Sequence, residues 1–237
     1  PSALCADPVT TFESTGCPMY LYDDNHLNDI EYLLNKDVLF EKIPYMIAQS
    51  LTGDYDEGNS YNWAQWKSFN EDMILGLYIR KMNIEDMKPE TCYQDKLDGN
   101  LALLCAEIEA HPETQFKISI PPYSMLWWDN IYRNGETESY LYNMEQAMEK
   151  LLTYENVELY YFLNDREIVT DLDNYMDLLH FSPEINQYIC DSMIRNDHKV
   201  TEANCHEIIE DSRSLAYQAV NELIKPYEDR IKVDIYD

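Results

Sequence analysis

The sequence predicts an α/β domain whose sheet is mostly parallel. Two apolar stretches, 116–120 and 157–163, have the composition and spacing of buried strands. Between them, apolar residues recur with helical period from Tyr140 to Leu152. A strand, a helix and a strand at this spacing form a βαβ unit, whose strands are almost always parallel. With 237 residues, 45% of them hydrophobic, the chain can bury one sizeable core.

The N-terminal part of the chain is predicted to be helical. An apolar pattern of helical period runs over 30–51, with a break or kink at Pro44 and a stop at Gly53. A second helix is expected around 68–82, in a polar and aromatic stretch. We expect residues 27–92 to form a helical insertion or cap packed on the main sheet.

The C-terminal part, 93–225, is predicted to hold the βαβ core and the last helices of a single domain spanning 1–237. A helix is expected over 97–108, where leucines and isoleucine form one face. Ser182-Pro183-Glu184 has the features of a helix start, and that helix should run to about Arg195. Thr201 is predicted to cap a last long helix.

The charge balance limits the partners. The chain has 17 Lys and Arg against 45 Asp and Glu, a formal net charge of −28. Such a surface repels phosphate backbones and anionic headgroups, so nucleic acid and direct membrane binding are not expected. A solvated acidic surface accounts for most of these side chains. The alternative for the acidic stretch 54–59 is a calcium-binding loop. Gly58 lies one place early for an EF-hand loop, and no closing Glu follows, so we predict no metal and no cofactor.

The six cysteines form no CxxC pair, which argues against a zinc site or a thioredoxin-like motif. In an exported protein they could form disulfides, and Cys5–Cys17 and Cys190–Cys205 would close the shortest loops. Cys105 lies on an apolar helical face and is predicted to be a buried thiol. No apolar stretch approaches the length that spans a bilayer, and no signal peptide is visible.

The chemistry is expected at the edge of the sheet where the parallel strands end, because ligands bind there in open α/β folds. Two segments leave the sheet at that edge, 121–128 and 164–180, so both should line one cleft. The second ends in Asp177-Leu178-Leu179-His180. At this spacing the carboxylate of Asp177 can hold one nitrogen of the His180 ring and make the other a base. An Asp–His pair is more often a surface hydrogen bond, but its position before a capped helix favours catalysis.

The stretch 173–186, DNYMDLLHFSPEIN, resembles the last block of SGNH/GDSL-type hydrolases. Three shorter motifs add a likeness to an uncharacterised bacterial branch: Tyr20–Asn25, Ile120–Ser124 and Leu172–Tyr175. The resemblance implies a three-layer α/β/α sandwich of the SGNH/flavodoxin-like kind. It also implies Asp177 as orienting acid, His180 as general base and a place in the cell envelope.

The sequence departs from that family at the nucleophile. The family carries its serine in a glycine-rich turn after the first strand, whereas Gly53-Asp54 is followed here by Tyr55, and Ser14 follows no strand. The chain also opens at Pro1 without a methionine. We therefore expect it to be the C-terminal two-thirds of such a domain, with the N-terminal strands and the nucleophile upstream. Without that missing segment the site would be incomplete and the chain inactive.

The resemblance implies a serine esterase or O-acyltransferase that acts on an acylated envelope polysaccharide or a small ester. Tyr123, Ser124, Trp127 and Asn174 are the candidate substrate-binding residues. Tyr123 and Trp127 could form an aromatic platform or a core plug, and Ser124 could be a stand-in nucleophile. One alternative is a non-catalytic α/β module that binds carbohydrate or protein. Another is an acidic structural domain in which the Asp–His pair only fastens a loop.

Overall fold

The structure is a computed structural model that describes residues 25, 27–28, 30, 34–53 and 67–234. The chain divides into two compact units, with the boundary between Lys67 and Ser68. We call them the N-terminal unit and the core unit, and each is described by itself. Three predicted features fall outside the described residues: the calcium loop at 54–59, the Cys5–Cys17 pair and most of the Tyr20–Asn25 motif.

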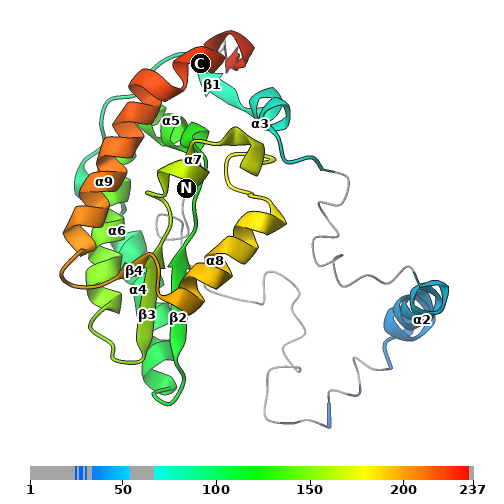
Figure 1. The fold of residues 1–237 in the computed structure, drawn as a ribbon. Coiled ribbons are helices and arrows are strands. Elements are labelled where there is room, and N and C mark those ends of the chain that lie inside the picture. The colour runs from blue at the N-terminus through cyan, green and yellow to red at the C-terminus, as the bar shows by residue number, and fades with distance from the viewer. Residues whose placement is uncertain (1–24, 26, 29, 31–33, 54–66, 235–237) are drawn as a thin grey trace. The chain divides into compact units, whose positions relative to one another are not determined.

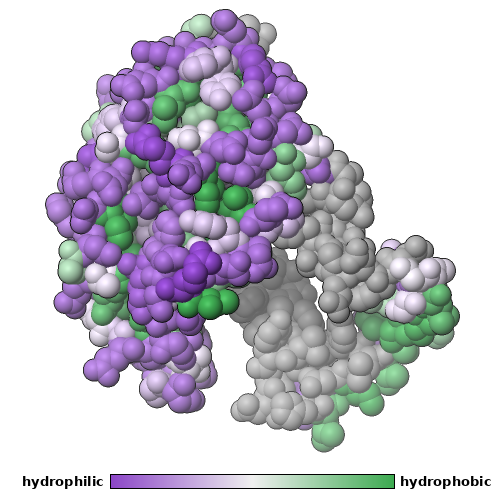
Figure 2. All heavy atoms as spheres, viewed as in Figure 1, coloured by the Kyte–Doolittle hydropathy of each residue, from purple (hydrophilic) through white to green (hydrophobic). Residues whose placement is uncertain are grey.

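The described part of the N-terminal unit is helical. A π-helical turn, η4 (Val38–Lys42), continues directly into α2 (Ile43–Thr52), and Pro44 is the second residue of α2. The helical run predicted to break or kink at Pro44 therefore continues past it, with the π-helical turn immediately before the proline. The helix ends as predicted at Gly53, whose φ of 77° is left-handed. Figure 2 shows hydrophobic surface on α2, which has no buried residue. The most exposed large apolar side chains of η4 and α2 are Phe40 in η4 and Tyr45, Ile47 and Leu51 in α2.

The core unit contains the predicted βαβ arrangement. Strands β2 (Phe116–Ile120) and β3 (Val157–Tyr161) pair in parallel, and α6 (Thr137–Leu151) lies between them in sequence. The short β4 (Lys199–Val200) pairs antiparallel with β3, giving a mixed sheet of order β2-β3-β4. Figure 1 shows these strands among the helices. The fold is therefore a helix-rich α/β fold with a small mixed sheet.

A second, two-stranded sheet joins distant parts of the core unit. Strand β1 (Ile79–Lys81) pairs in parallel with β5 (Lys232–Asp234). This pairing explains why the helix expected around 68–82 is shorter: α3 (Glu71–Leu77) ends before Tyr78, whose backbone is already extended. Local sequence favours a longer helix there, but the partner strand that competes with it lies more than 150 residues away.

The remaining helices follow the apolar periodicity, with two corrections. The segment 121–128, expected to be a loop, becomes helical at Met125. The last helix begins at Cys205 behind Asn204, because the Asn204 Oδ1 accepts from the backbone N–H of Thr201 at 2.7 Å and draws that residue into a turn. The helical elements are η6 (Glu90–Tyr93), α4 (Gln94–Ala110), α5 (Met125–Arg133), α7 (Arg166–Val169), η7 (Leu172–Asn174), α8 (Pro183–Arg195), α9 (Cys205–Gln218), η8 (Ala219–Leu223) and η9 (Lys225–Arg230).

Strand β3 and the residues after it are buried on both faces. Leu159 and Tyr161 join the main core cluster, which includes side chains of α6 and α9. Tyr160 and Phe162 point the other way and pack against Ile189 of α8. This two-sided burial accounts for the unbroken apolar run in the sequence, since a strand covered on one face only would alternate. Figure 2 shows that hydrophilic side chains cover most of the visible surface of the core unit.

A buried charge network fixes α5 against β1. The Asp129 carboxylate on α5 is fully buried and accepts from the Tyr78 hydroxyl at 2.7 Å. It also accepts from Nε and Nη2 of Arg80, at 2.8 and 2.9 Å, and from Nε of Arg133 at 3.2 Å. Burial, followed by the nearby Asp129 charge, raises the pKa of Tyr78. Arg80 reaches the surface through Glu228 at 3.0 Å. The network sets the position of the helix that carries Trp127.

The four described cysteines are free thiols. Cys105 is buried, as its place on the apolar face of α4 predicts. Cys190 is exposed and Cys205 is buried, so the pair that would close the shortest C-terminal loop is not bonded. Within the described ranges, no helix combines the length and the apolarity needed to cross a bilayer.

Candidate active site

The Asp–His sequence lies in a tight turn that is anchored at its base. Tyr175 and Phe181 form an isolated antiparallel bridge, and the Met176 N–H donates to the His180 carbonyl at 3.1 Å. The fully buried Tyr175 donates its hydroxyl to the carbonyl of Pro122 at 2.9 Å. Its pKa is raised, first by burial. The base of the turn is thereby fixed to the segment that follows β2.

Ser124 provides a second anchor. Its N–H and its hydroxyl both donate to the carbonyl of Leu178, each at 3.1 Å, and its side chain is fully buried. The two segments that leave the ends of β2 and β3 therefore meet, as the parallel topology predicts. A buried hydroxyl that supports the turn does not face a substrate. In this structure Ser124 supports the turn through Leu178.

The His180 ring contacts the Asp177 carboxylate. Nδ1 lies 2.7 Å from Oδ2 and 2.9 Å from Oδ1. The same carboxylate accepts the backbone N–H groups of Leu179 and His180, both at 2.9 Å. Partial burial pushes the pKa of Asp177 up, but these backbone bonds and the His180 contact outweigh it, so the pKa is lowered. The carboxylate is thus held in its charged form against the ring.

The pair opens onto a shallow groove of about 340 Å³. The groove is lined by Trp127 and Asn130 of α5 and by Asp177, Leu178, Leu179 and His180 of the turn. Trp127 and Asn130 are one helical turn apart, so they share a face of α5. Asn130 also borders a neighbouring hollow of about 170 Å³ that reaches β1. Sequence reasoning missed Asn130 because it did not predict α5; with that helix in hand, its spacing from Trp127 would have indicated it.

The four candidate substrate-binding residues do not gather in one place. Trp127 lines the groove, although only 3% of it is exposed. Tyr123 is half-buried and lines a different cavity, on the side of α6. Asn174 donates its side-chain amide to the carbonyl of Ile168 at 3.3 Å and is not part of the groove lining. Ser124 lies beneath the turn.

The arrangement can perform acid–base chemistry. A carboxylate against Nδ1 favours the tautomer that carries its proton there, which puts the basic lone pair of His180 on Nε2. The charge of Asp177 also stabilises the imidazolium that forms when the ring takes a proton. Among the described residues, those that line the groove include no serine, threonine or cysteine. A nucleophile would therefore have to come from residues other than these.

Three other histidines of the described residues, His111, His198 and His206, also lie near carboxylates, so the pairing alone does not identify a site. His206 Nδ1 lies 2.8 Å from Glu145 Oε1, and this hydrogen bond raises the pKa of His206. The neighbouring Cys205 thiol is a poor nucleophile, because burial raises its pKa to about 11. His198 Nε2 lies 2.9 Å from the Tyr188 hydroxyl, outside the cavities described above. Among these four histidines, it is His180 that combines a carboxylate on Nδ1 with a groove at the carboxyl edge of the sheet.

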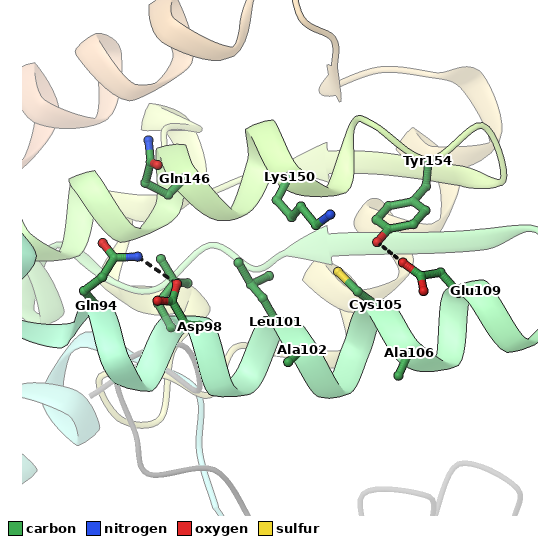
Figure 3. A pocket seen from close by; sticks show the side chains of 11 residues that line it. Gln94, Asp98, Leu101, Ala102, Cys105, Ala106, Glu109, Gln146, Lys150 and Tyr154 are labelled. Carbon is green, nitrogen blue, oxygen red and sulfur yellow. Dashed lines mark hydrogen bonds between the residues drawn. The ribbon is translucent and has the colours of Figure 1, made fainter.

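A larger cavity, of about 490 Å³, lies between α4 and α6 (Figure 3). Leu101 and Cys105 lie along α4, and Tyr154 donates its hydroxyl to Glu109 at 2.6 Å across the cavity. The Gln94 side-chain amide donates a hydrogen bond to the Asp98 carboxylate at 2.8 Å. Its described lining residues include no histidine and therefore no acid–base pair of the kind found at the turn.

Comparison of the chain with protein-family models, with curated proteins and with solved structures gave no match. The likeness to SGNH/GDSL-type hydrolases therefore rests on the sequence motifs, above all on 173–186. Within the described residues, no group of three or more histidine, cysteine and acidic side chains could hold a metal ion.

Proposed function

We propose that this chain supplies the acid–base half of a Ser-His-Asp site in an esterase or O-acyltransferase. Asp177 orients the His180 ring, and His180 is the general base. The observation that carries the proposal is the 2.7 Å contact of His180 Nδ1 with Asp177 Oδ2 beside a groove at the carboxyl edge of β2 and β3. That edge is where open α/β sheets bind ligands.

In the proposed reaction, a serine hydroxyl attacks the carbonyl carbon of an ester while His180 Nε2 takes its proton. The imidazolium then gives this proton to the leaving alcohol, and an acyl-serine remains. Water or a second alcohol repeats the exchange, with His180 again as base, so hydrolysis and transfer share one site. Asn130 is placed to donate to the oxyanion, since it borders the groove one helical turn from Trp127.

The sequence likeness adds three further proposals. The serine and its strand are supplied by a segment upstream of Pro1, the complete domain is a three-layer α/β/α sandwich, and the substrate is an acylated polysaccharide of the cell envelope or a small ester. One feature of the sheet supports the first two. Among the described residues no strand pairs with the outer edge of β2, so the backbone groups of Lys117 and Ser119 that face away from β3 can accept another strand.

The non-catalytic binding module receives less support. An aromatic platform for a sugar needs an exposed ring face, whereas Trp127 is 3% and Trp128 0% exposed. In the structural alternative, the Asp177–His180 pair only fastens the turn. The His180→Ala experiment below distinguishes this alternative from catalysis.

The test uses the full-length gene product and an aryl acetate. His180→Ala should lower kcat about 10³-fold, the usual size of a general-base contribution. His206→Ala is the matched control, because it removes another exposed histidine whose Nδ1 contacts a carboxylate at 2.8 Å. It should leave the rate unchanged. Unchanged hydrolysis in His180→Ala, with the protein still folded, would reject the proposal and favour a structural pair.

A further inference from the structure

A second cavity, which we call the α6 slot, lies beside the candidate active site. Its volume is about 240 Å³, and it is enclosed by the end of β2, by one residue of α4 and by α6. It is lined by Leu104, Ile118, Ser119, Ile120, Pro121, Tyr123, Tyr140, Met144, Ala147, Met148 and Leu151.

The lining of the α6 slot extends along α6. Its α6 residues, from Tyr140 to Leu151, recur at helical spacing and form one stripe about 16 Å long at 1.5 Å per residue. Ile118 and Ile120 of β2 face this stripe. A volume of about 240 Å³ bordered by a stripe of that length fits an unbranched chain better than a ring. The methionines at 144 and 148 can change rotamer to fit such a chain.

The described residues that line the α6 slot carry no charge, although the chain has 45 acidic and 17 basic residues. None of these described residues is Asp, Glu, Lys, Arg or His. The polar side chains among them are the hydroxyls of Ser119, Tyr123 and Tyr140, so a charged group would lose its solvation there without an opposite charge, whereas methylene groups would gain from leaving water. The chemistry therefore selects a neutral hydrocarbon chain.

One side chain connects the α6 slot with the candidate active site. The Trp127 ring lies 5.0 Å from the Tyr123 ring and 4.7 Å from the Tyr140 ring, centroid to centroid, and both tyrosines line the slot. Trp127 also lines the groove beside His180. The Trp127 side chain therefore lies between an ester bound at His180 and the α6 slot.

We propose that the α6 slot binds the acyl chain of the substrate, which makes the substrate an ester of a medium or long unbranched acid. This inference rests on the proposed function, because it takes the reacting ester to lie beside His180. Binding of the chain itself is independent of catalysis. The two claims can therefore fail separately.

The test measures binding of neutral 1-alkanols, from butanol to decanol, to the full chain by titration calorimetry. Affinity should rise about fourfold with each added methylene, the equivalent of about 0.8 kcal/mol, until the slot is filled. A bromine-tipped octanol should quench tryptophan fluorescence, because Trp127 adjoins two lining residues. Affinity that does not depend on chain length would overturn the proposal.

Two variants locate the binding. Ile118→Phe fills the α6 slot from a half-buried strand position that tolerates an aromatic residue, and it should weaken octanol binding about tenfold or more. Ala102→Phe, an exposed position lining the separate α4–α6 cavity, is the matched control and should bind normally. Equal binding by the two variants, or equal loss in both, would place the alkanol elsewhere and reject the slot.

His180→Ala separates this inference from the proposed function. It should bind octanol as the parent does, since His180 does not line the slot. Normal octanol binding with no esterase activity in the full-length protein would reject the function alone. Hydrolysis of an aryl acetate but no faster reaction with the octanoate ester would reject the acyl-chain assignment alone.

Discussion

The buried carboxylate of Asp129 gives the sharpest stability prediction. Asp129→Asn keeps the size of the side chain but removes its charge. Two guanidinium groups then remain beside a neutral amide: Arg80, whose side chain is 11% exposed, and Arg133, at 12%. Removing one partner of a buried ion pair costs about 3–5 kcal/mol, since the charge that remains is poorly solvated.

The surroundings place this protein at the low end of that range. Arg80 keeps its 3.0 Å contact with Glu228, and Arg133 still donates to the Lys81 carbonyl at 2.8 Å. We therefore expect Asp129→Asn to lower the free energy of unfolding by about 3 kcal/mol. Glu228→Gln is the control on the same guanidinium. Its side chain is 52% exposed, so its loss should cost less than about 1 kcal/mol.

Urea denaturation followed by tryptophan fluorescence measures both variants, because Trp127 and Trp128 are buried on the same helix as Asp129. With a slope of about 2 kcal/mol per molar urea, the midpoint of Asp129→Asn should fall by about 1.5 M at unchanged slope. A shift no larger than that of Glu228→Gln would show that the buried charges are solvated in another way. It would refute the view that this network fixes α5.

Three further substitutions test the site and its support. Ser124→Ala removes the side-chain hydrogen bond to the Leu178 carbonyl but keeps the backbone donor, so the free energy of unfolding should fall by about 1 kcal/mol. Loss of all esterase activity in the full-length protein would instead mark Ser124 as a nucleophile. Gly135→Ala should lower the free energy of unfolding by at least about 2 kcal/mol, because φ is +66° and a Cβ would overlap the Asp86 carbonyl. Gly53→Ala is the control: its added Cβ meets nothing within 4 Å, so we expect a loss of about 1 kcal/mol. A loss for Gly135→Ala no larger than that of the control would contradict the prediction. Asp177→Asn should destabilise the protein at pH 6, because the lowered pKa of Asp177 means that its charged form is stabilised by folding. That difference should be complete above the unfolded pKa of about 3.9 and fade as pH falls through the lower folded value; a difference that persists unchanged at the acid end of a pH series of melts would argue against the carboxylate contacts.

Local sequence determined the elements with a clear period or end signal. The strand at 116–120, the helix that starts behind Ser182 and ends at Arg195, and the helix stop at Gly53 were all predictable, because each depends on side chains within a few residues. The contact of Asp177 with His180 belongs to this group. The two residues are three apart in one turn, and the backbone N–H groups of that turn hold the carboxylate.

Tertiary structure decided what local patterns hide. Helix α5 was missed because its nine residues are too few to establish a helical period, and the paired prolines before it resemble a loop. The extended backbone at 79–81 depends on a strand at the other end of the chain. Likewise, Ser124 became a support because it meets Leu178, 54 residues away, and the groove exists because α5 lies beside the turn. Contacts of this range are set by how the elements pack in three dimensions, which the period of a single segment does not record.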